Sequence, residues 1–149
     1  MSTLLKGLYD QDFYTWALES AQALRERRFA DIDIGHIAEE LEDMGQGRER
    51  ALESQLTRLI AHLLKWSQQP EARPWCGNSW QASICNARRE IQKLLKRNPG
   101  LKPKIQEIFE DAYAGAVEWA IMDTNLPESR FPPACPWSLK QAMDEGFWP

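Results

Sequence analysis

Cysteine is scarce in this sequence and follows no metal-binding or redox pattern. Cys76, Cys85 and Cys135 make an odd count, and no two of them form a C-x-x-C pair. This arrangement suits reduced thiols better than a disulfide framework, and it favours a cytoplasmic location. A zinc site would also need histidines, and the chain has only two. We therefore expect neither a disulfide framework nor structural zinc.

Long apolar runs are absent as well. The first eight residues lack the apolar stretch of a signal peptide. No segment approaches the roughly 18 consecutive apolar residues of a membrane helix. These absences predict a chain without a membrane span.

The short motifs that identify many enzymes are also missing. The chain contains no G-x-S-x-G, no Walker loop, no H-E-x-x-H and no glycine-rich phosphate turn. A fold can still assemble a catalytic site from distant residues, so an enzyme is less expected but not excluded. We expect no cofactor.

The composition is that of a globular protein with many tryptophans. A length of 149 residues suits one domain, and 43% hydrophobic with 27% charged residues argues against extensive disorder. Most of the seven tryptophans are expected in the core, with Trp16, Trp66 and Trp80 as candidates for lining a ligand pocket. The net charge of −4 argues against general phosphate binding.

Apolar residues recur at three- and four-residue spacing, the period of amphipathic helices. The pattern predicts five helices: one from an Asp10 or Asp12 cap to Arg28, then 34–44, 48–67, one from Asn78 or Ser79 to Arg97, and 101–123. We expect the proline- and aromatic-rich tail, residues 124–149, to be irregular apart from a short helix near Ser138 and to pack on the bundle. No strand-like alternation of useful length occurs. The predicted fold is an all-α single-domain bundle spanning residues 1–149.

Two predicted helices have well-defined apolar faces. The face of 34–44 consists of Ile34, Ile37, Ala38, Leu41 and Met44. The segment 48–67 is the most hydrophobic, and we expect it to be the central helix. The glycines of Gly45-Gln46-Gly47 are expected to weaken or break the helix between the two segments.

Seven sequence blocks along nearly the whole chain carry a resemblance to a known family. They are Leu8-Tyr9-Asp10-x-Asp12-Phe13-Tyr14-x-Trp16, Ile32-Asp33, Ala38-Glu39-Glu40-Leu41, His62-Leu63-Leu64-Lys65-Trp66, Ser79-Trp80-x-x-Ser83-Ile84-x-x-x-Arg88, Asn98-Pro99-x-Leu101 and Phe131-Pro132-x-x-Cys135-Pro136-Trp137. On these blocks the chain resembles the bacterial family known as domain of unknown function 29. Gly100 and Gly146 depart from the family pattern, which usually has serine at the first position and often an acidic residue at the second. The resemblance implies a helical fold and a bacterial origin, and it implies no activity.

Acidic residues crowd into residues 31–43, where one group could carry chemistry. His36 and Glu40 are four residues apart, so on a helix they can share a metal ion or a proton. If the predicted helices 34–44 and 48–67 pack antiparallel, His62 could approach His36 and Glu40. This gives the hypothesis of an acid–base or metal-dependent enzyme using Glu39, Glu40 and His62, with His36, Glu40 and His62 as a weaker metal set. The alternative is a solvated acidic face, with His62 hydrogen-bonded at a helix–helix boundary.

Arg88 follows Trp80 and Ile84 at four-residue steps, so the three share one helix face. A charge beside an apolar stripe needs a partner, and we expect a carboxylate to provide it. The candidate polar site therefore contains Asp12, Glu39, Glu40, His62 and Arg88.

Basic residues occupy the outer side of the predicted helix that ends at Arg97. They are Arg89, Lys93, Lys96 and Arg97. A solvated face is the default interpretation, and nucleic-acid binding is the alternative. No stacking aromatics alternate with these charges, which weakens the nucleic-acid hypothesis.

Three functional hypotheses follow. The favoured one is a non-enzymatic, regulatory or interaction module that binds an unidentified protein partner through exposed helix faces. The second is the metal-dependent or acid–base enzyme, and the third is nucleic-acid binding through the basic helix. The sequence leaves the oligomeric state open.

Overall fold

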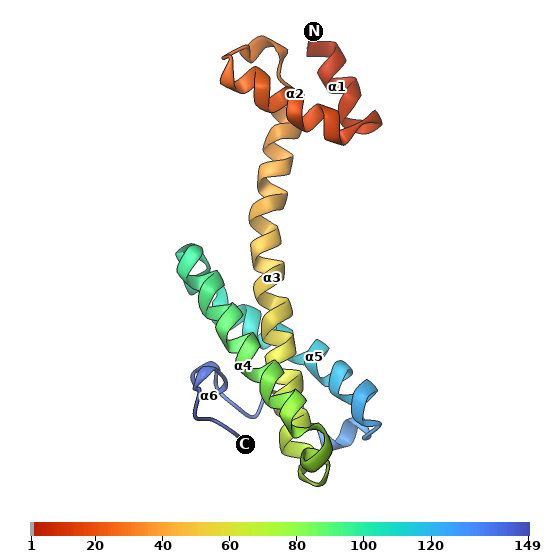
Figure 1. Cartoon of the computed structure of the whole chain (residues 1–149), viewed down its shortest axis with the longest axis vertical. Helices are drawn as coiled ribbons and strands as arrows, with labels where there is room; N and C mark the ends of the chain where they lie inside the picture. Colours follow the sequence, from red (N-terminus) through yellow and green to blue (C-terminus); the bar gives the residue numbers. More distant parts are fainter. Residues whose placement is uncertain (1) are drawn as a thin grey trace. The chain divides into compact units, whose positions relative to one another are not determined.

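The computed structural model describes the backbone of residues 2–149 and the side chains of residues 5–149. Every regular element in that range is helical, and the described residues contain no strand (Figure 1). The predicted all-α class is therefore confirmed. The chain forms two compact units, residues 1–46 and 47–149, which are described separately below. That both make one domain remains a prediction.

The first unit begins with two helices joined by a tight corner. α1 (Ser2–Gln11) is followed directly by α2 (Phe13–Arg25), and Asp12 between them accepts a hydrogen bond from the Thr15 N–H at 3.0 Å. The predicted Asp12 cap is confirmed, because a carboxylate at this position satisfies a free N–H of the first turn. Sequence reasoning missed α1 as a separate helix.

α2 ends three residues before Arg28, where the first helix was predicted to end. Arg27 adopts a left-handed φ of 58°, and the Arg28 N–H bonds to the Ala23 carbonyl at 2.8 Å. The Arg27 N–H bonds to the Leu24 carbonyl at 3.1 Å, which completes a Schellman-type helix end. This end is formed without the glycine that normally marks it in a sequence.

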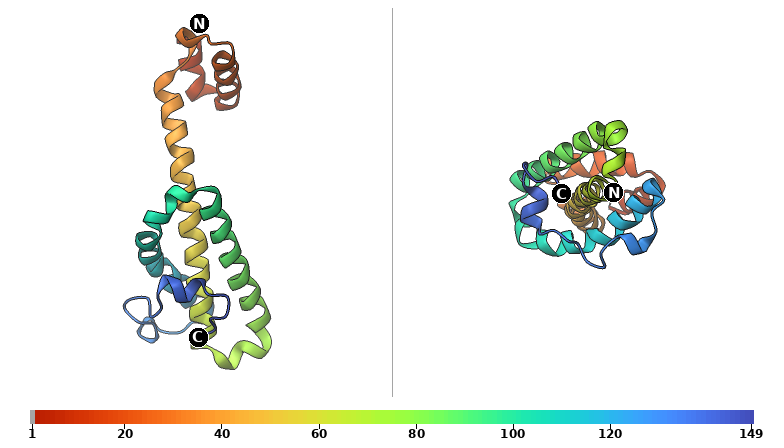
Figure 2. Two further views of the ribbon diagram at one scale, coloured as in Figure 1. Left: turned by 90° about the vertical axis from the view of Figure 1, so that its left-hand side faces the viewer. Right: turned by 90° about the horizontal axis from the view of Figure 1, so that it is seen from below.

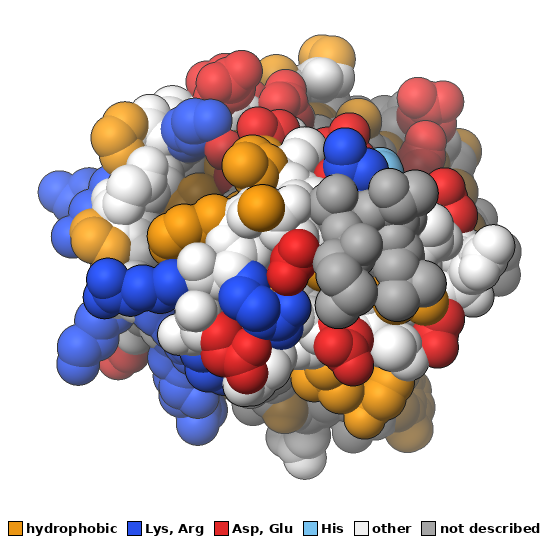
Figure 3. All heavy atoms as spheres, turned by 90° about the horizontal axis from the view of Figure 1, so that it is seen from above, with side chains coloured by type: hydrophobic (Ala, Val, Ile, Leu, Met, Phe, Trp, Pro, Cys, Tyr) orange, Lys and Arg blue, Asp and Glu red, His pale blue; other side chains and the backbone are white. Residues whose placement is uncertain are grey.

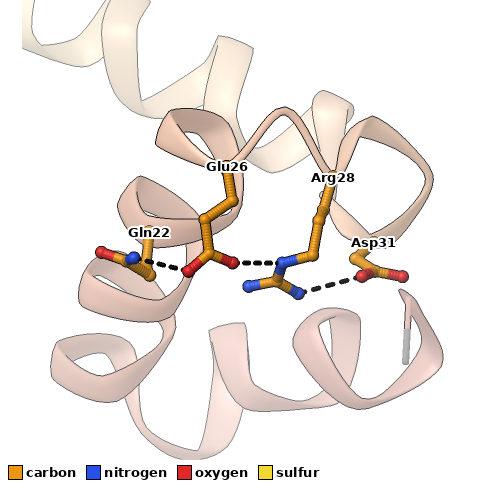
Figure 4. Close-up of polar contacts among 4 residues, drawn as sticks. All are labelled: Gln22, Glu26, Arg28 and Asp31. Atoms are coloured by element: carbon orange, nitrogen blue, oxygen red, sulfur yellow. Dashed lines mark hydrogen bonds and ion pairs between the residues drawn. The ribbon is translucent and has the colours of Figure 1, made fainter.

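The turn after α2 leads into η1 (Phe29–Asp31) and is closed by polar contacts (Figure 4). Arg28 binds Glu26 at 2.6 Å and Asp31 at 2.9 Å, and Gln22 donates to Glu26 at 2.6 Å. These side chains remain partly exposed to solvent, so each pair contributes little stability, and together they fix the path of the turn.

α3 (Ile34–Gln68) is a single continuous helix, and the predicted break at Gly45-Gln46-Gly47 is wrong. A glycine inside a helix costs only about 1 kcal/mol relative to alanine. The flanking turns contain good helix formers, so two glycines weaken the helix locally without ending it. The two predicted helices 34–44 and 48–67 are therefore parts of one.

The second unit is built around the C-terminal half of α3. Its apolar side chains are completely buried, as predicted for the central segment: Leu52, Leu56, Leu59, Ile60, Leu63 and Leu64. Viewed from below, this half of α3 lies in the middle, with α4, α5 and the tail around it (Figure 2). Burial of these side chains is the main stabilising contribution in the unit.

α4 and α5 differ from their predicted boundaries. After η2 (Pro70–Ala72), α4 (Arg73–Arg97) begins before the predicted start, because Pro74 is tolerated in a first turn. After η3 (Pro99–Lys104), α5 (Ile105–Thr124) begins later than predicted. The prolines of η3 lie in a 3-10 turn instead of the first turn of α5.

The C-terminal tail packs on the second unit, as predicted. It contains η4 (Glu128–Arg130) and the short helix α6 (Leu139–Met143), which Ser138 caps. Phe131 and Ala142 belong to the buried core. The tail therefore completes the unit.

Candidate functional site

The residues of the predicted polar site belong to both units: Asp12, Glu39 and Glu40 to the first, and His62 and Arg88 to the second. The Asp12 carboxylate is occupied by Thr15, whose hydroxyl donates to it at 2.6 Å, and these contacts lower the pKa of Asp12. Glu39 is exposed. Glu40, His62 and Arg88 each have a separate set of partners.

Glu40 belongs to a cluster in the first unit that also contains Tyr9, Asp33 and His36; we call it the Tyr9 cluster. The Tyr9 hydroxyl donates to Glu40 Oε1 at 2.6 Å, and its ring stacks on His36 with centroids 3.8 Å apart. The His36 ring pairs with the buried Asp33 carboxylate. The cluster fastens α1 to the first turns of α3.

The electrostatics of the Tyr9 cluster follow from these contacts. The hydrogen bond to Glu40 raises the pKa of Tyr9 to about 12. Burial pushes the pKa of Asp33 up, but hydrogen bonds from His36 outweigh burial and the net shift is downward. The same contact with Asp33 raises the pKa of His36, so a charged pair is favoured in mildly acidic solution.

Sequence reasoning included Glu40 and His36 and missed Tyr9 and Asp33. Both missed residues lie in the sequence blocks that carry the family resemblance. Their place in these blocks was the one sequence signal that could have identified them. The two could be joined only by knowing that α1 folds back on α3.

The arrangement needed for the proposed metal or acid–base site does not form. That site required an antiparallel helix pair, but Glu39, Glu40, His36 and His62 all lie on the continuous α3. His62 belongs to the second unit and the other three to the first. Within residues 5–149, no group of three or more His, Cys, Asp or Glu side chains is arranged to hold a metal ion.

His62 lies instead at a helix–helix boundary in the second unit. One ring nitrogen is 2.8 Å from the Arg58 carbonyl, and the ring meets Trp119 of α5 edge-on, with centroids 5.4 Å apart. Burial lowers the pKa of His62. The buried Lys65 pairs with Asp123, which also accepts a hydrogen bond from Trp119 at 3.0 Å. These contacts join α3 to α5.

Arg88 anchors the tail, and the predicted carboxylate partners Asp12, Glu39 and Glu40 are wrong. Its Nε donates to the Ala142 carbonyl at 2.8 Å and its Nη2 to the Phe147 carbonyl at 2.9 Å. The guanidinium also lies 5.3 Å from the Trp148 ring centroid. Sequence spacing identifies a buried charge, but backbone carbonyls as partners leave no trace in a sequence.

Arg73 makes a second contact of the same kind. Its Nη2 donates to the Trp66 carbonyl at 2.7 Å and to the Pro149 carbonyl at 3.3 Å. It stacks on the Trp66 ring at 4.4 Å, and Trp66 in turn packs against Trp148 at 5.3 Å. Two arginines of α4 thus hold the end of the tail.

The three tryptophans predicted to line a pocket have separate surroundings. Trp16 packs on Tyr9 and Phe13 in the first unit. Trp66 contacts Arg73 and Trp148, and Trp80 is buried in α4. No cavity described in the second unit is lined by either Trp66 or Trp80.

The basic residues of α4 are exposed, as both interpretations of them require. Arg89, Lys93, Lys96 and Arg97 face solvent, and Lys93 pairs with Glu90 at 3.3 Å. Nucleic-acid binding by this face stays a prediction.

Exposed apolar side chains are concentrated in the first unit, and this concentration was not anticipated. Among the side chains that the structure describes, eleven large hydrophobic ones are exposed, and eight of these lie in the first unit: Phe13, Tyr14, Leu18, Leu24, Phe29, Ile34, Leu41 and Met44. The predicted apolar face of α3 is thus present but faces solvent, with Ile34, Leu41 and Met44 each more than 60% exposed. Hydrophobic side chains stand among acidic ones in the surface view of Figure 3.

The charge of this unit is strongly negative. Residues 1–46 carry four basic and ten acidic side chains, whereas residues 47–149 carry fourteen and twelve. The first unit therefore combines an apolar surface with a net charge of −6, and the second has a net charge of +2. We call the eight exposed residues of the first unit the apolar surface.

No helix formed by the described residues is long and apolar enough to cross a membrane. No curated protein and no solved structure gives a significant match to the chain. The model of one family, the domain of unknown function DUF29, matches residues 8–148. That match spans nearly the whole chain and agrees with the helical fold, so the chain belongs to the DUF29 family.

Proposed function

We propose that this chain is a non-enzymatic interaction module of the bacterial cytoplasm that binds a protein partner through the apolar surface of its first unit. The observation that carries the proposal is the exposure of the amphipathic face of α3, at Ile34, Leu41 and Met44. Exposed apolar patches on a protein surface often mark interaction sites.

The spacing of these side chains indicates what kind of partner fits. Ile34, Leu41 and Met44 are seven and three residues apart, so they lie along one side of the helix. A row of this kind pairs well with the apolar face of another helix. The partner is therefore an amphipathic helical segment.

The charge of the first unit indicates which residues should flank the apolar face of the partner helix. The first unit has a net charge of −6, and Glu39 and Glu42 lie exposed on the same stretch of α3. A basic partner is attracted to such a surface, whereas a second acidic unit of the same kind is repelled. A helix with apolar anchors and lysine or arginine flanks satisfies both requirements.

The cytoplasm is supported by the three cysteines, which form no disulfide. A bacterial origin rests on the family resemblance. The enzyme hypothesis required an antiparallel pair of helices, whereas its residues Glu39, Glu40 and His62 all lie on the continuous α3.

A peptide-binding experiment tests the proposal. The probe is a fluorescent amphipathic helix of leucine and lysine, and the control is the same helix with glutamate in place of lysine. We expect saturable binding of the basic peptide only. The double variant Leu41→Gln/Met44→Gln should weaken it by about tenfold or more, since central anchors dominate such interfaces.

The matched control is Met122→Gln, because Met122 is 80% exposed on α5 in the second unit. This variant should bind like the wild type. Equal binding of the two peptides, or equal affinity for the basic peptide in the α3 variant and the wild type, would refute the proposal.

A further inference from the structure

A cavity of about 330 Å³ lies between α4 and the tail of the second unit. Four residues line it: Cys85, Arg88 and Arg89 of α4, and Glu145 after α6. The hydrogen bonds from Arg88 to the tail carbonyls do not fill this cavity. It is also separate from the apolar surface of the first unit, so its interpretation does not depend on the proposed partner.

Arg88 lines this cavity, and its guanidinium has one nitrogen that is buried without a hydrogen-bond acceptor. Its Nε and Nη2 donate to tail carbonyls, but its Nη1 has no acceptor among the described residues. The residue is only 2% exposed. Buried donors in folded proteins nearly always have a partner, and a buried charge needs one most.

The protein's own carboxylates do not provide that partner. Asp144 and Glu145 act on Arg88 only at longer range, and burial lowers its pKa despite them. Neither Arg89 nor Glu145 forms an ion pair in the described part of the chain. Two guanidinium groups and one carboxylate thus line the cavity, so the net charge of its lining is positive.

We propose that this cavity binds a small oxyanion, the carboxylate or phosphate group of a small molecule. Arg88 supplies a buried positive charge at the wall of the cavity, and Arg89 supplies the exposed guanidinium that contacts the anion. Guanidinium groups are matched to oxyanions because their N–H donors lie in one plane and bind two oxygens at once. The volume is roughly ten times that of one water molecule, so it has room for the anion and an attached group.

The cysteines of α4 provide a direct readout. Cys85 lines the cavity and is exposed, whereas Cys76 is equally exposed on the same helix and does not line it. The experiment is alkylation with iodoacetamide, followed for each cysteine by mass spectrometry. Sodium phosphate and sodium acetate are titrated separately, with sodium chloride at matched ionic strength as the reference.

We expect phosphate or acetate to slow the alkylation of Cys85 saturably and to leave Cys76 unchanged. The anion that protects at lower concentration identifies the phosphate or the carboxylate class. Arg89→Gln should raise the half-protecting concentration by about tenfold, since it removes a charge-assisted contact. Glu145→Gln should lower that concentration, because it removes the only negative side chain at the cavity.

Arg97→Gln is the matched control, since Arg97 is exposed on the same helix and loses the same charge without lining the cavity. It should behave like the wild type. Equal effects of Arg89→Gln and Arg97→Gln would mean general screening and overturn the proposal. Protection no greater than in chloride, or protection seen only in Glu145→Gln, would overturn it as well, because water or Glu145 itself would then be the partner of Arg88.

Discussion

At the scale of single residues, Arg88 holds the C-terminal tail on the second unit. It joins α4 to the tail through two hydrogen bonds to carbonyls and a contact with Trp148. Hydrogen bonds to charged groups are each worth about 1.5–3 kcal/mol, and loss of the donor leaves a buried carbonyl unsatisfied. The energetic role of this residue is therefore structural, and any ligand role is added to it.

Substitution of Arg88 tests this role. Arg88→Ala should reduce the free energy of unfolding by about 3 kcal/mol. Arg88→Lys should also destabilise the protein, because an ammonium group cannot reproduce the fork that reaches both Ala142 and Phe147. The measurement is urea unfolding, with the exposed Arg89→Ala as control. An Arg88→Ala protein with wild-type stability would show that the tail is not anchored there.

The Tyr9 cluster makes the stability of the first unit depend on pH. The pKa of His36 is raised by Asp33, so its contribution is full below its ordinary pKa of 6.5 and is lost as pH rises through the raised value. The pKa of Asp33 is lowered, so its contribution is full above its ordinary 3.8 and is lost as pH falls through the lowered value. Both contributions are complete between these two ordinary values.

His36→Gln should remove this dependence. The stability difference between wild type and variant should be largest between pH 3.8 and 6.5 and should shrink on either side. Thermal unfolding at a series of pH values measures it. His62 titrates with the opposite sign, since burial lowers its pKa, and it cancels in the difference because both proteins contain it. A difference that does not vary with pH would contradict the ion pair.

At the scale of elements, α3 is the helix on which both units are built. Its C-terminal half is buried in the second unit, while its N-terminal half carries the exposed row of Ile34, Leu41 and Met44. The same amphipathic pattern therefore gives a buried apolar face in one half of the helix and an exposed apolar face in the other. Periodicity predicts an apolar face, but it does not indicate whether the same chain covers that face.

The continuity of α3 can be tested at Gly45. No heavy atom of the rest of the chain lies within 4 Å of the position of an added Cβ. Gly45→Ala should therefore raise the free energy of unfolding by about 0.5–1 kcal/mol, because alanine is the better helix former and loses less entropy. Chemical denaturation with the helix content followed by circular dichroism gives the value. Destabilisation by alanine would favour a break at this position.

At the scale of the whole molecule, the features of the fold that depend on local sequence patterns could be predicted from the sequence. The helical class, the buried residues from Leu52 to Leu64 and the packed tail rest on periodicity and composition, which act locally. The continuity through Gly45 was missed because a helix can absorb two glycines. The end of α2 at Arg25 was missed because the left-handed conformation of Arg27, which terminates the helix, has no sequence signature.

The candidate sites were less accessible to prediction than the fold. Arg88 was identified as a buried charge, but its partners are main-chain carbonyls of the tail, which any residue could supply. Tyr9 meets His36, the partner of Asp33, only because α1 folds back, which is a tertiary event. The same applies to Glu145 and Arg89, which are far apart in the sequence and line one cavity.

Charge and exposure together distinguish the two units of the chain. Residues 1–46 are acidic with uncovered apolar side chains, whereas residues 47–149 are nearly balanced around a closed core. A closed core needs no further protein to be stable. An exposed apolar face on a charged unit instead indicates a surface kept for a partner, and that is the central claim of the proposed function.

Site-specific photo-crosslinking in a bacterial host that naturally produces the protein tests this claim most directly. A photoreactive phenylalanine analogue replaces Leu41 in one protein and Met122 in another, so each exposed hydrophobic position carries the same probe. We predict a discrete crosslinked protein from position 41, absent from position 122 and reduced by high salt because the partner is basic. No discrete product at position 41, or the same products at both positions, would contradict the claim.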